Sequence, residues 1–209
     1  FGRCRQLDRN RPIRASTKNV MVSPNGTPYA VWVDDRSGRA EVYLKYFDDS
    51  SDSWRGLGGS DQAGGISQND GTTDWYWNGI GGLDFDSAGR PHVVWSHRRA
   101  TGHIYLKYFD GQQWQQLNGS ATHEGISEGK NAYWPKLTFD SAQRVTVAWC
   151  AYGSINGVYV KQYRAGAWEG LGGSNSDTGL AQSDAQVEFA TVAVGPDEQL
   201  YVAWAAHRS

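Results

Sequence analysis

Val42-Tyr43-Leu44-Lys45-Tyr46-Phe47-Asp48 occurs three times, with small changes, in the 209 residues of the chain. Its copies are Ile104-Tyr105-Leu106-Lys107-Tyr108-Phe109-Asp110 and Val158-Tyr159-Val160-Lys161-Gln162-Tyr163. Apolar and polar side chains alternate along each copy, which is typical of a half-buried β-strand. A strand sequence that recurs along the chain predicts an architecture built from repeated units.

Other segments recur in a fixed order around this strand. The segment before it ends in a tryptophan, and these tryptophans are 63, 54 and 55 residues apart: Trp32, Trp95, Trp149 and Trp204. The segment after it, Trp54 to Ser60, returns at Trp114 to Ser120 and at Trp168 to Ser174. A further alternating strand precedes the tryptophan strand and joins it through a turn, as at Asn25-Gly26. Each unit therefore contains four antiparallel strands, A to D, in about 55 residues.

Four-stranded units of this length are typical of β-propeller blades. We therefore predict an all-β fold, a single β-propeller domain over residues 1–209 made of four-stranded antiparallel blades. A β-sandwich would not repeat its strand sequences, and the coil of a β-solenoid would be shorter. The three complete blades are expected at residues 19–57, 82–117 and 136–171, and a partial blade at 189–204.

The first eighteen residues form a basic arm with six Arg or Lys side chains and one acid, Asp8. Within it, Arg3-Cys4-Arg5-Gln6-Leu7 aligns with Gln113-Trp114-Gln115-Gln116-Leu117 and is predicted to be an orphan strand D. The partial blade and this strand leave three ways to close a ring. They are a small four-bladed monomer, two chains that share junction blades in a ring of about eight, and a piece of a longer propeller.

Composition narrows the functional classes. Aromatic residues make up 13% of the chain, with 10 Trp and 26 Gly, so we expect an aromatic core and many turns. No apolar run reaches the roughly 20 residues of a transmembrane helix. The basic residues do not interleave with the aromatic ones, so no nucleic-acid partner is predicted. The chain starts at Phe1 without a signal-like segment, and we expect a processed form or a fragment.

Antiparallel connectivity places the B–C and D–A connections on one face of the propeller. The D–A connections are long and rich in glycine, as at Gly58 to Gly81 and Asn118 to Pro135. Long loops on a rigid scaffold often carry function. The ligand-binding residues are therefore expected on this face.

Aromatic rings next to hydrogen-bonding groups suit a sugar, because its C–H face stacks on rings while its hydroxyls need donors and acceptors. Such residues in the D–A connections are Asp74, Trp75, Tyr76, Trp77, Asn78, Tyr133 and Trp134. Charged residues of the B–C loops complete the candidate set, either as anion ligands or as solvated loop charges: Asp34, Arg36, His97 and Arg98.

Catalytic and metal signals are weak. No nucleophile motif, phosphate loop or histidine pair with metal-ligand spacing occurs, and Asp86, Asp110 and Asp140 recur at turns, where aspartate caps hairpins. No catalytic residue, metal or cofactor is predicted. Two cysteines do not make a disulfide framework. Cys4 and Cys150 align with positions near opposite faces, which favours a free thiol or an interchain bond through Cys4.

The segments Trp32 to Tyr43 and Asp86 to Trp95 resemble the BNR/sialidase-like repeats of secreted and cell-surface propellers, although the Asp-to-Trp distance is longer here than in the strict Asp-box. The arginine triad and Tyr/Glu pair of true sialidases match no residues of this chain, so the resemblance implies the fold and not hydrolysis. The repeats also look like those of propeller lectins. We expect a noncatalytic, glycan-binding propeller in an extracellular, periplasmic or cell-surface location. The alternatives are a scaffolding subunit that docks on a protein partner, with a homo-oligomer or larger assembly closing the ring, and a fragment of a polysaccharide hydrolase or lyase.

Overall fold

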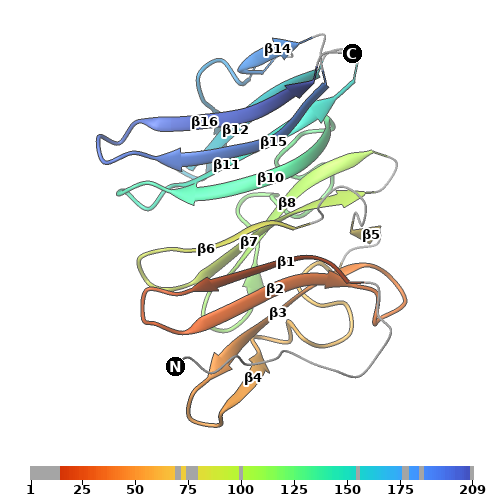
Figure 1. The fold of residues 1–209 in the computed structure, drawn as a ribbon, viewed down its shortest axis with the longest axis vertical. Coiled ribbons are helices and arrows are strands. Elements are labelled where there is room, and N and C mark those ends of the chain that lie inside the picture. The colour runs from red at the N-terminus through yellow and green to blue at the C-terminus, as the bar shows by residue number, and fades with distance from the viewer. Residues whose placement is uncertain are drawn as a thin grey trace.

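The computed structural model describes residues 15–68, 72–73, 80–98, 101–153, 156–175, 179–183 and 186–207. Every regular element in these ranges is a β-strand, and they contain no helix that is long and apolar enough to cross a membrane. Four sheets follow one another in chain order from one end of the molecule to the other (Figure 1). The predicted all-β propeller of antiparallel blades is confirmed.

Each sheet corresponds to one blade of the sequence repeat. Blade one has the strand order β1 (Ala15–Val22), β2 (Pro28–Asp34), β3 (Glu41–Asp48) and β4 (Ser53–Gly56). Blade two contains β5 (Thr72–Thr73), β6 (Ile80–Phe85), β7 (Pro91–Arg98), β8 (Gly102–Phe109) and β9 (Trp114–Gln115). Blade three contains β10 (Asn131–Phe139), β11 (Val145–Tyr152), β12 (Asn156–Arg164), β13 (Ala167–Gly170) and β14 (Ala181–Ser183). The last described sheet pairs β15 (Gln186–Val194) with β16 (Leu200–His207).

All strand pairs are antiparallel, so the B–C and D–A connections share one edge of the blades. The innermost strand of blade three differs from expectation. It begins at Asn131, upstream of the predicted start at 136, so Tyr133 and Trp134 lie in a strand and not in a connecting loop. The register with β11 shifts between Tyr133 and Lys136, and Trp134 has φ of 52°. This bulge breaks the alternation from which the strand start was predicted.

The D–A connections are packed more closely than their length suggested. In blade one the connection returns along β3, where Leu44 N–H donates to Ser60 O and Ile66 N–H donates to Val42 O. The Ser60 hydroxyl donates to Leu44 O at 2.7 Å and accepts from Leu57 N–H at 2.8 Å. Blade two repeats these two bonds at Ser120. The serine of this repeat, Ser60 or Ser120, therefore helps to complete the outer edge of the sheet.

The core lies between successive blades. Val31, Val33 and Leu44 of blade one form a buried cluster with Leu83 and Trp95 of blade two. A second cluster joins Val94, Ile104 and Leu106 of blade two to Val147 and Trp149 of blade three. Blade two thus buries one face against blade one and the other against blade three.

The two ends of the row expose apolar side chains instead. On blade one, Val20 and Val22 are 61% and 60% exposed, whereas Leu83 and Phe85, at the matching positions of blade two, are 3% and 8% exposed. On the last sheet, Phe189 and Tyr201 are also exposed. These end faces have the composition of inter-blade surfaces.

Candidate functional site

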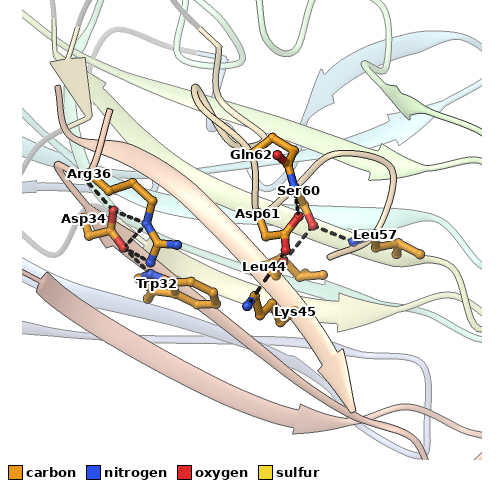
Figure 2. A network of polar contacts seen from close by, with 9 residues as sticks. All are labelled: Trp32, Asp34, Arg36, Leu44, Lys45, Leu57, Ser60, Asp61 and Gln62. Atoms are coloured by element: carbon orange, nitrogen blue, oxygen red, sulfur yellow. Dashed lines mark hydrogen bonds and ion pairs between the residues drawn. The ribbon is translucent and has the colours of Figure 1, made fainter. Parts of the chain in front are cut away.

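The clearest polar constellation on the B–C edge is in blade one. Asp34, the last residue of β2, is 1% exposed and accepts a hydrogen bond from Trp32 Nε1 at 2.6 Å. Arg36 Nε lies 2.9 Å from both carboxylate oxygens of Asp34, and the Arg36 backbone N–H donates to Oδ1 at 3.1 Å. Figure 2 shows Arg36 folded back over the strand end onto this carboxylate. The Asp34–Arg36 pair closes a tight local turn.

Two aromatic rings support the Arg36 guanidinium. Its Cζ is 4.6 Å from the centroid of Tyr43 and 5.4 Å from that of Trp32, within the range of cation–π attraction. Trp32 and Tyr43 are directly opposite each other on β2 and β3, and their rings stack at 6.0 Å. Burial raises the pKa of Tyr43, whose hydroxyl donates to Ser37 Oγ. We call Trp32, Asp34, Arg36 and Tyr43 the blade-one cluster.

The blade-one cluster is fixed and partly open to solvent. The Arg36 side chain is 28% exposed, whereas Trp32 and Tyr43 are buried. A second network on β3 holds the neighbouring D–A connection, through Ser60 and through Lys45 Nζ, 3.8 Å from Asp61 Oδ2 (Figure 2). The arrangement offers a preorganised, partly exposed guanidinium that is held by buried aromatic rings, with its charge balanced by Asp34.

His97 occupies the position of Asp34 in blade two, but its setting is different. The ring is buried and stacks on Tyr105, with centroids 4.9 Å apart. Tyr105 also stacks on His103, which pairs with His97 across the strands. The structure therefore places His97 within strand β7 with a buried ring, and not in the B–C loop where it was expected. Arg98 is the last residue of β7.

Tyr133 and Trp134 are also core residues, which differs from the expectation of rings available for stacking. Both are buried, and the Trp134 ring contacts Tyr152 at 5.6 Å and Phe189 at 5.1 Å. The Tyr133 hydroxyl donates to Asn131 Oδ1 at 2.7 Å. The contact between Trp134 and Phe189 joins blade three to the last sheet. The remaining predicted residues, Asp74, Trp75, Tyr76, Trp77 and Asn78, lie outside the described residues.

Of the predicted residues, the structure thus brings Asp34 and Arg36 together, whereas His97, Tyr133 and Trp134 lie in strands with buried rings. Trp32 and Tyr43 were missed as site residues because both repeat in every blade and were attributed to packing. The cross-strand register is the signal that would have paired them, since it sets Trp32 opposite Tyr43.

The described residues contain no group of three or more metal-ligating side chains. Glu41, which pairs with Asp34 across β2 and β3, is buried, and burial raises its pKa. Its Oε2 accepts the hydroxyl of Ser67, and Lys107 of the next blade provides a nearby positive charge. Glu41 is thereby part of a blade junction.

No known family profile and no curated protein matches the sequence. Solved structures do match the fold. An endo-arabinase from Bacteroides thetaiotaomicron is 14% identical with a TM-score of 0.51, over 90% of this chain and 68% of its own. An α-L-arabinofuranosidase from Fusarium graminearum is 12% identical with a TM-score of 0.56, over 92% of this chain and 56% of its own. An ulvan lyase, a polysaccharide lyase, is 13% identical with a TM-score of 0.50, over 89% and 44%. The chain spans about half to two thirds of the length of most of these propellers.

Proposed function

We propose that the chain is a noncatalytic glycan-binding β-propeller, acting outside the cytoplasm, that binds sugars on its B–C/D–A face. The observation that carries the proposal is the blade-one cluster, in which Asp34 holds the partly exposed Arg36 against Trp32 and Tyr43. An arginine fixed in this way donates hydrogen bonds to hydroxyl groups at a low entropic cost. The rings of Trp32 and Tyr43 are buried and hold the guanidinium in place.

Charge balance favours a neutral sugar over a polyanion. The buried carboxylate of Asp34 compensates the positive charge of Arg36 within 3 Å. The chain as a whole carries a formal net charge of −2, which does not attract polyanions. The predicted Trp75 and Trp77 would extend the same face.

The comparisons lend support at the level of fold, because the matching propellers are named for action on arabinose-containing substrates and on a polysaccharide. The BNR/sialidase-like character of the repeats remains a prediction, as does the extracellular, periplasmic or cell-surface location.

The test is a glycan-array screen of the whole chain, followed by calorimetry with the best-bound sugar. Replacing Arg36 with Gln is expected to weaken that binding at least about tenfold, the effect of losing one or two good hydrogen bonds. A Trp75→Ala, Trp77→Ala double variant is expected to weaken it as well.

Arg55→Gln is the matched control, because Arg55 forms an exposed ion pair with Asp48 at the other end of the same blade. It is expected to bind like the wild type. Arg36→Lys keeps the positive charge next to Asp34 and so serves as a variant in which the fold is retained. Circular dichroism checks that each variant is folded. Binding that is unchanged in Arg36→Gln, or no binding to any glycan, would overturn the proposal.

Two observations favour other functions. The exposed apolar end faces, with Val20, Val22, Phe189 and Tyr201, favour a scaffolding subunit that docks on a protein assembly. The part-length match to polysaccharide-degrading enzymes favours a fragment of a hydrolase or lyase. Copurification with a fixed partner would support the first alternative, and release of sugar from arabinan would support the second.

A further inference from the structure

The outer strands of successive blades are linked by a repeated hydrogen bond. Trp114 Nε1 of blade two donates to the carbonyl oxygen of Leu57 in blade one at 2.8 Å. Trp168 Nε1 of blade three donates to the carbonyl oxygen of Leu117 in blade two at 2.9 Å. In each case the acceptor is the leucine that follows strand D of the preceding blade.

Trp54 is the residue of blade one at the same position. It pairs with Phe47 across β3 and β4, as Trp114 pairs with Phe109 across β8 and β9. Its ring packs edge-on against Phe47 at 5.5 Å. The Nε1 atom of Trp54 is buried but has no hydrogen-bond partner among the described residues. A buried donor that lacks its acceptor is costly, which points to an acceptor elsewhere.

Three other positions on this face of blade one, Lys45, Val20 and Val22, show the same pattern. Lys107 of blade two donates to Ile66 O in blade one at 2.8 Å, and Lys161 of blade three pairs with Glu128 of blade two at 2.6 Å. Lys45, the matching residue of blade one, pairs instead with Asp61 of its own blade, at 3.8 Å. Val20 and Val22, as noted, are exposed where the matching side chains of blade two are buried. This exposed face of blade one therefore carries the same groups that contact the preceding blade in blades two and three.

From these contacts we infer that residues 3–7 of this chain dock on the outer end of that face as the strand D of a preceding blade. The carbonyl oxygen of Leu7 would accept the hydrogen bond of Trp54 Nε1. Arg3-Cys4-Arg5-Gln6-Leu7 aligns with Gln113 to Leu117, and Leu7 falls at the position of the two observed acceptors, Leu57 and Leu117. The Leu7 side chain would pack next to Trp54, as Leu57 packs in the cluster that contains Trp114.

The chain length between Leu7 and β1 permits this arrangement. Eight peptide units separate Leu7 from Ala15, where β1 begins, and they span up to about 26 Å when extended. The distance from strand D to strand A within one sheet is about 14 Å, and stacked sheets lie about 10 Å apart. The distance from strand D of one sheet to strand A of the next is therefore about 17 Å. Asp8-Arg9-Asn10 replaces Gly-Gly-Ser, which fits a short direct connection that does not return along strand C.

Exchange of the Trp54 indole proton, followed by NMR on uniformly ¹⁵N-labelled full-length protein, tests this inference. In the wild type the Trp54 indole proton should be protected like that of Trp114. Leu7→Asp should speed its exchange at least about tenfold and leave Trp114 unchanged, because only the local opening is affected. Arg3→Gln, at the far end of the segment, is the control and should leave both unchanged.

A synthetic peptide of residues 1–10, added to the Leu7→Asp variant, should restore the protection of Trp54. If Trp54 exchanges freely in the wild type, or if Leu7→Asp leaves its protection intact, the inference is overturned. Protection that is lost on roughly a hundredfold dilution would assign the strand to a second copy and overturn docking within one chain.

Discussion

The indole Nε1 of Trp114 donates a hydrogen bond to the carbonyl oxygen of Leu57 across the boundary between blades one and two, at 2.8 Å. In blade two the tryptophan of strand D therefore does more than fill the core, because it links two sheets that share no strand ladder. Trp168 makes the same link to Leu117.

Replacing Trp114 with Phe should lower the free energy of unfolding by about 1–2 kcal/mol, since it removes this bond and leaves the Leu57 carbonyl without its donor. Urea denaturation followed by circular dichroism measures the change, and Trp168→Phe should behave alike. Trp204→Phe is the control: Trp204 is an exposed tryptophan on the end sheet and should change stability by less than about 0.5 kcal/mol. Equal losses in all three variants would show that ring volume, and not the hydrogen bond, matters.

The sequence repeat was sufficient to predict the blades. In a strand with one buried and one half-buried face, apolar and polar residues alternate with a period of two, and this pattern is visible in the sequence. It failed where the backbone departs from that period. At Trp134 a bulge with positive φ breaks the alternation, so Asn131–Trp134 were assigned to a loop. The return of the D–A connection onto β3 was also missed, because Ser60 and Ile66 pair through backbone groups that leave no periodic signature.

The candidate site was predicted only in part, for a related reason. Asp34 and Arg36 are two residues apart, so their pairing is a local event that the sequence makes visible. Tyr43 joins them through the register of β2 with β3, which a single strand does not encode. Trp134 is buried by Phe189 from another blade, and a linear motif carries no information on that contact.

Replacing Asp34 with Ala should lower the free energy of unfolding by about 2 kcal/mol. The change removes the acceptor of Trp32 Nε1 and the carboxylate that pairs with Arg36. Chemical denaturation measures it, with Asp35→Ala at the neighbouring, more exposed carboxylate as control. If Asp34→Ala proves as stable as Asp35→Ala, the pair contributes no net stability.

His92 should make the fold sensitive to acid. The ring is buried between Tyr108 at 5.1 Å and Phe139 at 4.9 Å, and its Nδ1 lies 3.0 Å from Arg90 O. Burial lowers the pKa of His92 from 6.5 to about 4, against the hydrogen bond to Arg90 O and the charge of Asp86, which raise it.

Since the unfolded chain binds a proton at His92 near pH 6.5 and the folded chain does not until about pH 4, stability should fall as the pH drops through this window. The loss should reach about 3 kcal/mol at pH 4 and grow no further below it. Urea titrations at several pH values measure it. Tyr29 holds the matching position in blade one, next to Tyr46 and Phe85, so His92→Tyr is the isostructural comparison. A wild-type pH profile that parallels that of His92→Tyr would contradict this assignment.

Cys150 should resist alkylation in the folded protein. The thiol is free and buried at the junction of blade three with the last sheet. Burial, assisted by the charge of Glu188 and opposed by the backbone hydrogen bond at Ala190, raises the pKa of Cys150 to about 11. At pH 8 only about one thousandth of this thiol would be the reactive thiolate.

Iodoacetamide treatment at that pH, followed by peptide mass spectrometry, should find Cys150 unmodified in native protein and fully modified in guanidinium chloride. The peptide map separates Cys150 from Cys4, so the second cysteine does not obscure the result. Modification of Cys150 at the same rate in both conditions would show that this blade junction opens readily, because only an opened junction exposes the sulfur.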